Sequence, residues 1–157
     1  MGSAASSAEQ LAAGAFRFAI AAARYNEPIV AALLAGARAA WKARGGALHA
    51  LQVEYVPGAF ELPLAARALA LQPGVDGVIA LGCVIRGETP HFEFVAGQCA
   101  AGLQRVMLDT GVPVSFGVLT VETLAQAQQR AAPGPANKGG EALETVLAMA
   151  SLLRRLK

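Results

Sequence analysis

The segment Gly77–Ile85 constrains the fold of this chain more than any other feature. It is apolar almost throughout, and the turn Arg86-Gly87-Glu88 follows it. A short, continuous apolar run is typical of a parallel β-strand, because helices cover both faces of such a strand. This segment therefore predicts an α/β fold with the strand inside a sheet.

The rest of the chain alternates between short strand patterns and longer helical patterns. Asn26 is expected to cap the first helix, and Thr89-Pro90 is expected to start the third. Strands are expected at residues 16–23, 48–56, 77–85 and 114–119, and helices at about 26–45, 60–71, 89–110, 122–130 and 137–156. This alternation predicts an α/β sandwich in which helices lie on both faces of a parallel sheet.

The length of 157 residues suits a single compact domain. We expect residues 16–157 to form this domain and the small, polar residues 1–15 to form a flexible N-terminal arm. The start lacks the pattern of a secretory signal, and the apolar stretches are too short to span a bilayer. We therefore expect a cytoplasmic protein in which Cys83 and Cys99 are reduced, buried thiols. Neither cysteine has partners at metal-ligand spacing, so no metal is expected.

The charge content is low for a chain of this size. Charged residues make up 15% of the sequence, against a typical share of about 25%, and the net charge is +2. This charge argues against nucleic acid and anionic membranes as partners. A surface with so few charges favours an oligomer whose subunits cover one another, although an alanine-rich composition explains the same figure.

The turns that follow the expected strands carry most of the chemically informative residues. Ligands of open parallel sheets bind at the carboxyl ends of the strands, near the switch in strand order. The turns after the first three strands are Arg24-Tyr25-Asn26, residues 56–61 and residues 86–91, and Phe116 lies in the fourth strand. Together they place aromatic rings, a carboxylate and a histidine at one edge of the sheet.

The third turn could bind an anion. A helix start offers free N–H groups and a partial positive charge, and Gly87 would let a ligand approach the backbone. Thr89 could cap the helix or contact the same anion. The helix dipole favours a neutral His91, which can accept a proton. The alternative is an ordinary capping turn with a surface histidine.

The other candidates also have two interpretations. Tyr25 and Phe60 could stack on a planar ring or plug loops, and Glu61 could bind polyol hydroxyls or complement a helix dipole. Arg130 and Lys138 could clamp a phosphate or satisfy their own helices.

Joined motifs give the chain a specific resemblance. The strings are Arg24-Tyr25-Asn26, VPGAFELPLAA at 56–66, LGCVIRGETPHFEFVA at 81–96, FGVLTVETLAQAQQRA at 116–131 and Asn137-Lys138-Gly139. In this order and spacing, from about Phe16 to the end, the chain resembles the lumazine synthase family. VPGAFE and VIRGETPHF are distinctive together.

The resemblance implies a flavodoxin-like, three-layer α/β/α sandwich with a four-stranded parallel sheet. It implies a transferase of riboflavin biosynthesis that condenses 5-amino-6-(D-ribitylamino)uracil with 3,4-dihydroxy-2-butanone 4-phosphate, releasing phosphate and water. It also implies homopentamers with active sites between subunits, a shell of sixty subunits in some members, and riboflavin synthase as a partner. No metal or redox cofactor is implied.

The resemblance also implies roles for individual residues. His91 corresponds to the proton-transfer residue. The residues implied to hold the pyrimidine and its ribityl chain are Tyr25, Ala59, Phe60, Glu61, Cys83, Val84, Ile85, Phe116 and Lys138. Those implied to bind phosphate are Gly87, Glu88, Thr89 and Arg130.

The chain departs from the family pattern at three places. The loop 132–136 has prolines where a lysine-containing stretch associated with shell assembly is common, but it keeps the same length. Tyr25 replaces phenylalanine or tryptophan and should still stack. Cys83 replaces a small residue such as threonine, which matters little if its contact is through the backbone. The alternatives are a flavodoxin-like binding module, an archaeal-type riboflavin synthase and an inactive shell protein.

Overall fold

The computed structural model describes residues 12–157. At its centre lies a four-stranded sheet in the order β2-β1-β3-β4, and all its pairings are parallel. The strands are β1 (Phe18–Ala23), β2 (Leu51–Val56), β3 (Gly77–Ile85) and β4 (Val114–Val121). The predicted interior strand is confirmed with the bounds that the apolar run gave it.

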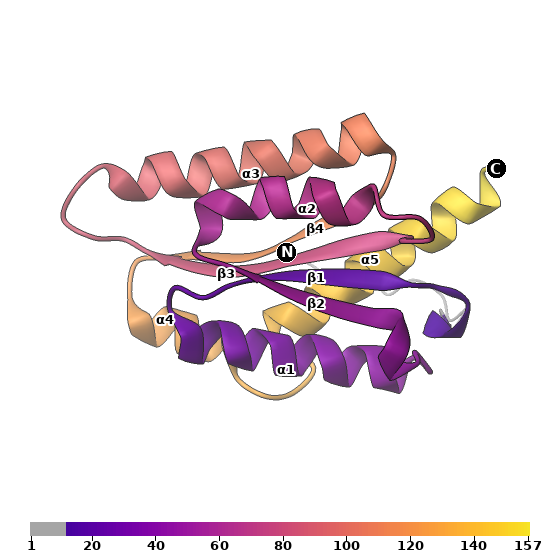
Figure 1. Ribbon diagram of the computed structural model, residues 1–157. Coiled ribbons are helices and arrows are strands. Elements are labelled where there is room, and N and C mark those ends of the chain that lie inside the picture. The colour runs from indigo at the N-terminus through magenta and orange to yellow at the C-terminus, as the bar shows by residue number, and fades with distance from the viewer. Residues whose placement is uncertain (1–11) are drawn as a thin grey trace.

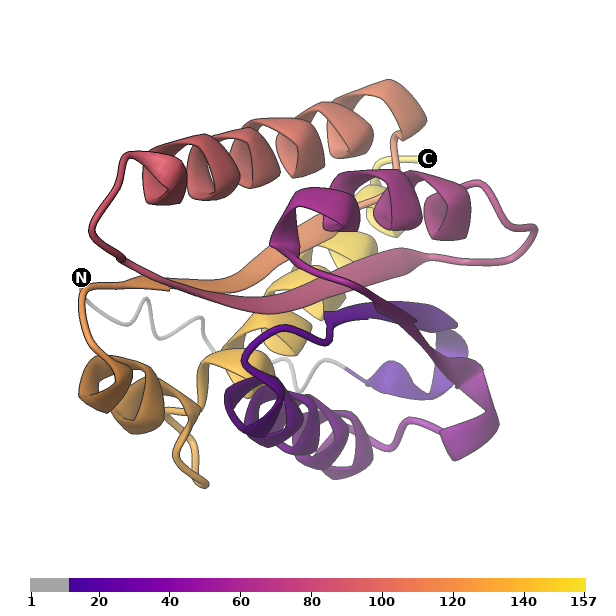
Figure 2. The same ribbon diagram turned by 60° about the vertical axis from the view of Figure 1, so that its left-hand side comes forward.

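Helices cover both faces of this sheet and complete the three-layer sandwich (Figure 1). The helices are α1 (Glu27–Ala43), α2 (Leu62–Ala70), α3 (His91–Thr110), α4 (Leu124–Ala131) and α5 (Lys138–Arg155), with short 3-10 turns η1 (Ala13–Ala15), η2 (Leu48–Ala50) and η3 (Ala59–Glu61). Helices α2 and α3 pack on one face, whereas α1, α4 and α5 pack on the other, as a second view shows (Figure 2). The predicted sandwich with a parallel sheet is confirmed.

The sheet separates two hydrophobic clusters. Phe18, Trp41 and Leu143 belong to the cluster under α1, α4 and α5. Leu62 and Leu103 belong to the cluster under α2 and α3. All six residues of β1 are buried, and four of them are alanines, so this central strand lets helices approach the sheet closely.

Several element bounds differ from the sequence prediction for local reasons. β2 begins at Leu51 because the preceding residues form η2. β4 continues to Val121, two residues beyond the predicted Leu119, because it still pairs with the end of β3. The arm predicted for residues 1–15 lies mostly outside the described residues, which begin at residue 12, and Ala13–Ala15 form η1.

The two predicted helix caps are wrong in detail. Asn26 occupies the N-cap position of α1, but its backbone is left-handed and its side chain makes no capping hydrogen bond. It donates instead to the carbonyl of Cys83. Helix α3 begins at His91, so Pro90 rather than Thr89 occupies the cap position, and the Thr89 hydroxyl accepts from the His91 N–H at 3.4 Å.

Helices α1 and α5 meet through small residues and one buried amide. Asn137 caps α5, and its Oδ1 accepts from the N–H groups of Gly139 and Gly140. Its Nδ2 donates to the carbonyls of Ala32, Ala131 and Ala132. Gly139 lies directly against the Leu33 carbonyl, where a Cβ atom would overlap it. This contact fixes the start of α5 against α1.

Candidate active site

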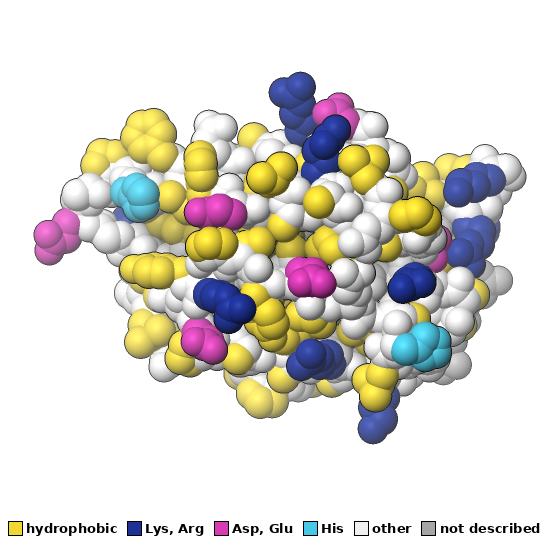
Figure 3. Space-filling model, viewed as in Figure 1, with side chains coloured by type: hydrophobic (Ala, Val, Ile, Leu, Met, Phe, Trp, Pro, Cys, Tyr) yellow, Lys and Arg dark blue, Asp and Glu magenta, His cyan; other side chains and the backbone are white. Residues whose placement is uncertain are grey.

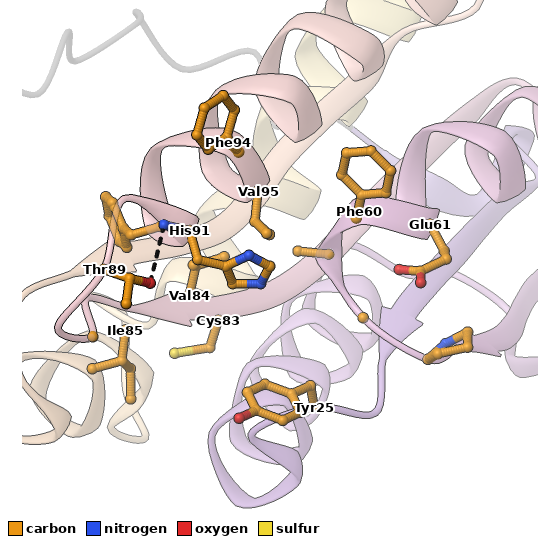
Figure 4. Close-up of a pocket in the computed structure, with 15 residues that line it drawn as sticks. Tyr25, Phe60, Glu61, Cys83, Val84, Ile85, Thr89, His91, Phe94 and Val95 are labelled. Atoms are coloured by element: carbon orange, nitrogen blue, oxygen red, sulfur yellow. Dashed lines mark hydrogen bonds between the residues drawn. The ribbon is translucent and has the colours of Figure 1, made fainter.

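A cavity lies at the point where the sheet topology reverses. The chain passes from β1 to β2 on one side and returns to β3 on the other, so the turns after β1 and β3 diverge. The cavity between them has a volume of about 850 Å³. It is lined by Tyr25, Pro57, Gly58, Ala59, Phe60, Glu61, Cys83, Val84, Ile85, Gly87, Thr89, His91, Phe92, Phe94 and Val95 (Figure 4).

Backbone hydrogen bonds hold the first two turns side by side. The N–H of Arg24 donates to the Val56 carbonyl at 2.8 Å, and the N–H of Tyr25 donates to the Pro57 carbonyl at 3.1 Å. The pairing of β1 with β2 thus continues beyond both strands. It brings Tyr25 opposite the turn that carries Phe60 and Glu61.

The end of β3 presents its backbone to the cavity. The N–H of Arg86 donates to the Val121 carbonyl in the direction of β4. Because successive residues of a strand direct their peptide groups to opposite sides, those of Cys83 and Ile85 are directed toward β1. The β1–β3 register ends at the pair Ala22 and Leu81, so β1 stops short of Ile85. The N–H and carbonyl of Ile85 can therefore pair with a planar ligand that has a donor beside an acceptor.

Helix α3 supplies the opposite wall. The His91 imidazole points from the first turn of α3 into the space between the end of β3 and the turn that carries Phe60 and Glu61 (Figure 4). Phe94 and Val95 follow one turn later on the same helix. The main polar side chains of the lining are those of Glu61, Thr89 and His91. An apolar cavity with a few convergent polar groups is suited to orienting a small ligand.

An ion-pair cluster holds the turn between β3 and α3. The Arg86 guanidinium pairs with Glu93 in the first turn of α3 and with Glu122 after β4, and it lies 4.2 Å from the centre of the Phe92 ring. The hydrogen bonds that Arg86 donates to Glu93 and Glu122 raise the pKa of Arg86, and the bond from Arg86 lowers the pKa of Glu93. Arg86 thus links the histidine-bearing helix to the β4–α4 turn.

Ten of the fourteen site residues expected from the sequence line this cavity. Glu88, Phe116, Arg130 and Lys138 do not. Arg130 donates to the Gln126 carbonyl of its own helix, and Lys138 pairs with Glu141 at 2.8 Å. In the single chain both side chains therefore satisfy their own helices, which is the alternative to a phosphate clamp. Phe116 lies on the edge strand β4 and is 45% exposed.

The sequence interpretation did not assign Pro57, Gly58, Phe92, Phe94 and Val95 to the site. A signal was present for two of them. Residues three and four positions after His91 lie on its helix face, which identifies Phe94 and Val95. Phe92 contacts Arg86, and the sequence alone does not show this contact.

The cavity contains one thiol, and we expect it to be unreactive. Burial raises the pKa of Cys83 to about 11 and that of Cys99 to about 12, from 9.0. Because the folded pKa is the higher one, the stability gained by keeping these thiols neutral is complete below pH 9 and is lost as pH rises through the folded values. Alkylation of the folded chain by iodoacetamide should be slow near neutral pH and accelerate in alkali.

Mass spectrometry of peptides alkylated at several pH values checks this expectation for each cysteine separately. The urea-unfolded chain is the control, and both thiols should react readily in it. Rapid alkylation of Cys83 in the folded chain near neutral pH would contradict the expectation.

Among residues 12–157, no group of three or more His, Cys, Asp or Glu side chains is gathered as a metal ion would require. No helix in this range is both long and apolar enough to cross a membrane.

Comparisons with known proteins assign the chain to a family. The family model for 6,7-dimethyl-8-ribityllumazine synthase matches residues 15–154. A relative of that name from Thermus thermophilus is 51% identical over 146 residues, covering 93% of both chains. Another from Syntrophus aciditrophicus is 46% identical over 147 residues, covering 94% of this chain and 96% of the relative. The chain therefore belongs to the 6,7-dimethyl-8-ribityllumazine synthase family.

Proposed function

We propose that this protein condenses 5-amino-6-(D-ribitylamino)uracil with 3,4-dihydroxy-2-butanone 4-phosphate to give 6,7-dimethyl-8-ribityllumazine. The observation that carries the proposal is the cavity between β1 and β3, which brings Tyr25, residues 59–61, the end of β3 and His91 together in a chain of this family. The reaction needs two substrates held in one orientation, and a preformed cavity supplies that.

The pyrimidine occupies the half of the cavity nearer β1. Tyr25 stacks on its ring, and the backbone at the end of β3 pairs with its uracil edge. Phe60 and Ala59 cover the ribityl chain, whose hydroxyls donate to the Glu61 carboxylate. Support comes from the positions of these side chains around one space, with Tyr25 and Glu61 on different turns (Figure 4).

The phosphorylated ketone occupies the half nearer α3. Gly87, Glu88 and Thr89 form the turn at the start of this 20-residue helix, where free N–H groups favour an anion. Arg130 contributes a guanidinium that pairs with phosphate oxygens. His91 then lies between the two substrates, because the ring faces the space from the first turn of the same helix.

Orientation and proton transfer account for the chemistry. The 5-amino group attacks the ketone, and loss of water gives an imine. Elimination of inorganic phosphate follows, and the ribitylamino nitrogen closes the second ring with loss of water. His91 takes and returns the protons that move in these steps. The protein supplies no covalent nucleophile.

We further propose that the active form is a homopentamer with sites between subunits, and that Phe116 and Lys138 reach the cavity of a neighbouring copy. Large exposed apolar side chains support this, since Leu64, Phe94 and Leu108 are 75%, 67% and 76% exposed. Hydrophobic side chains lie over α2 and α3 in the space-filling view (Figure 3). The unchanged length of loop 132–136 is consistent with a sixty-subunit shell.

Riboflavin synthase, which consumes the product, is the expected partner, and we place both enzymes in the cytoplasm.

A direct assay tests the proposed activity. Purified protein is mixed with the two substrates, lumazine fluorescence is followed, and the particle mass is recorded in the same preparation. Lumazine formation supports the proposal. Riboflavin formed from added lumazine would instead indicate a riboflavin synthase, and tight flavin binding without turnover would indicate a binding module.

Replacing Arg130 by alanine should selectively weaken use of the phosphorylated substrate. Loss of a charge-assisted pair to phosphate should raise its KM about tenfold to a hundredfold. The KM of the pyrimidine should stay within about twofold, because the guanidinium is assigned to the other substrate. Arg155→Ala, at the exposed end of α5, is the matched control. Unchanged kinetics in the Arg130 variant would remove its assigned role.

A further inference from the structure

The turn after β1 contains an unusual backbone conformation. Among residues 12–157, Asn26 is the one residue other than glycine with a positive φ, at 59°. L-residues rarely adopt this left-handed region, and asparagine tolerates it better than most. The conformation directs the Asn26 side chain away from the helix that it precedes and toward β3.

The Asn26 amide replaces a missing strand partner. β3 stays paired with β4 as far as Ile85, but its pairing with β1 ends at Leu81. The next β1-facing carbonyl is that of Cys83, and Asn26 Nδ2 donates to it at 2.8 Å. One side chain thus continues the β1–β3 ladder past the last residue of β1.

This bond joins two parts of the cavity, the turn after β1 and the end of β3. Tyr25 precedes Asn26 in the same turn and is 74% exposed, so packing does little to hold its ring in place. The N–H groups of Ile29 and Val30 donate to the Asn26 carbonyl, which fixes the other end of the turn to α1. The amide therefore sets the spacing between the Tyr25 turn and the backbone of Ile85.

We propose that Asn26 is a positioning residue for the planar substrate, acting through Tyr25 and the end of β3. The proposal rests on the proposed function for the identity of that substrate. By occupying the Cys83 carbonyl, Asn26 makes Ile85 the first residue of β3 whose β1-facing peptide groups are left for a ring edge. It also keeps Tyr25 over that edge.

Three substitutions of Asn26 distinguish the effect of losing the side-chain amide from the effect of straining the backbone. Asn26→Gly keeps the left-handed conformation without strain and removes only the amide. Asn26→Ala removes the amide and adds the cost of a Cβ in this conformation. Asn26→Asp keeps the shape but presents a carboxylate to the Cys83 carbonyl, so it can donate only when protonated.

We expect Asn26→Gly to raise the KM of the pyrimidine about tenfold, as loss of one well-placed hydrogen bond predicts. The KM of the phosphorylated ketone and kcat should stay within about twofold, because the groups around α3 are unaffected. Asn26→Ala should show the same KM change with a lower Tm. In Asn26→Asp the pyrimidine KM, relative to the parent at each pH, should recover as pH falls.

Hydrogen exchange of the parent and Asn26→Gly gives a second readout that needs no turnover. Amides of Tyr25, Asn26 and Ile85 should exchange faster in the variant, and those of α5 should not. If the parent makes no lumazine, the proposed function fails. Hydrogen exchange still tests whether the Asn26–Cys83 hydrogen bond holds the turn after β1 against the end of β3. An unchanged pyrimidine KM and unchanged exchange in Asn26→Gly would overturn the proposal. A fall in kcat with both KM values unchanged would also overturn it, since that pattern reports only less folded enzyme.

Discussion

We expect His91→Ala to lower kcat about a hundredfold without abolishing lumazine formation. A positioned acid–base group typically contributes roughly 10²–10⁴-fold, and the lower value applies here because water can carry protons in an open cavity. Orientation of the two substrates does not depend on the imidazole and persists in the variant. Both KM values should therefore change much less than kcat.

Single-turnover measurement of lumazine formation with both substrates saturating isolates this effect. His49→Ala is the matched control, because His49 is the other histidine of the chain and lies exposed in η2, away from the cavity. His91→Gln retains a side chain of similar reach that cannot transfer a proton, so it should be as slow as His91→Ala. A kcat within about twofold of the parent in both His91 variants would show that proton transfer uses water or substrate groups instead.

Gly139→Ala should destabilise the fold strongly. A Cβ atom at this position would overlap the carbonyl of Leu33, which is fixed within α1 and cannot move as a side chain can. Overpacking against backbone costs about 3 kcal/mol, at the upper end of the usual range. For a chain of this length, that loss lowers Tm by roughly 10 °C.

Gly140→Ala is the matched control for this variant. A Cβ atom there would lie 3.3 Å from the Gly36 carbonyl, which is tight but tolerable with a small shift. Alanine is also the better helix former, so the stability of this variant should stay within about 1 kcal/mol of the parent. Thermal unfolding followed by circular dichroism compares the two. Equal Tm values for both variants would mean that α1 and α5 can separate at little cost.

The parts of the fold that sequence predicted well are those that depend on local pattern. The bounds of β3 follow from an uninterrupted apolar run, and α1 and α3 end just before Gly45 and Gly111, which both have a positive φ. The contact that Asn26 makes could not be predicted in this way. Its local pattern is that of a helix cap, whereas its partner is Cys83, 57 residues later in the chain. Only the folded arrangement shows that β3 extends beyond the end of β1, so that the Cys83 carbonyl can accept from the Asn26 amide.

The same distinction between local pattern and folded arrangement applies to the residues of the site. The residues on the turns after β1, β2 and β3 came together because the carboxyl ends of parallel strands share one edge. Arg130, Lys138 and Phe116 follow or belong to β4, which lies two strands away from β1, and none of them lines the cavity of its own chain. The resemblance assigned these residues to the site, but the fold of the single chain does not bring them to its cavity.

The backbone bonds between neighbouring turns have a consequence for how such a chain can vary during evolution. Arg24 and Tyr25 are hydrogen-bonded to Val56 and Pro57 at the end of β2, and Arg86 is hydrogen-bonded to the end of β4. A residue inserted in one of these turns would therefore displace the next turn. The loop 132–136 is exposed, and Asn137 anchors its ends. Insertions can therefore accumulate in that loop while the cavity keeps its shape.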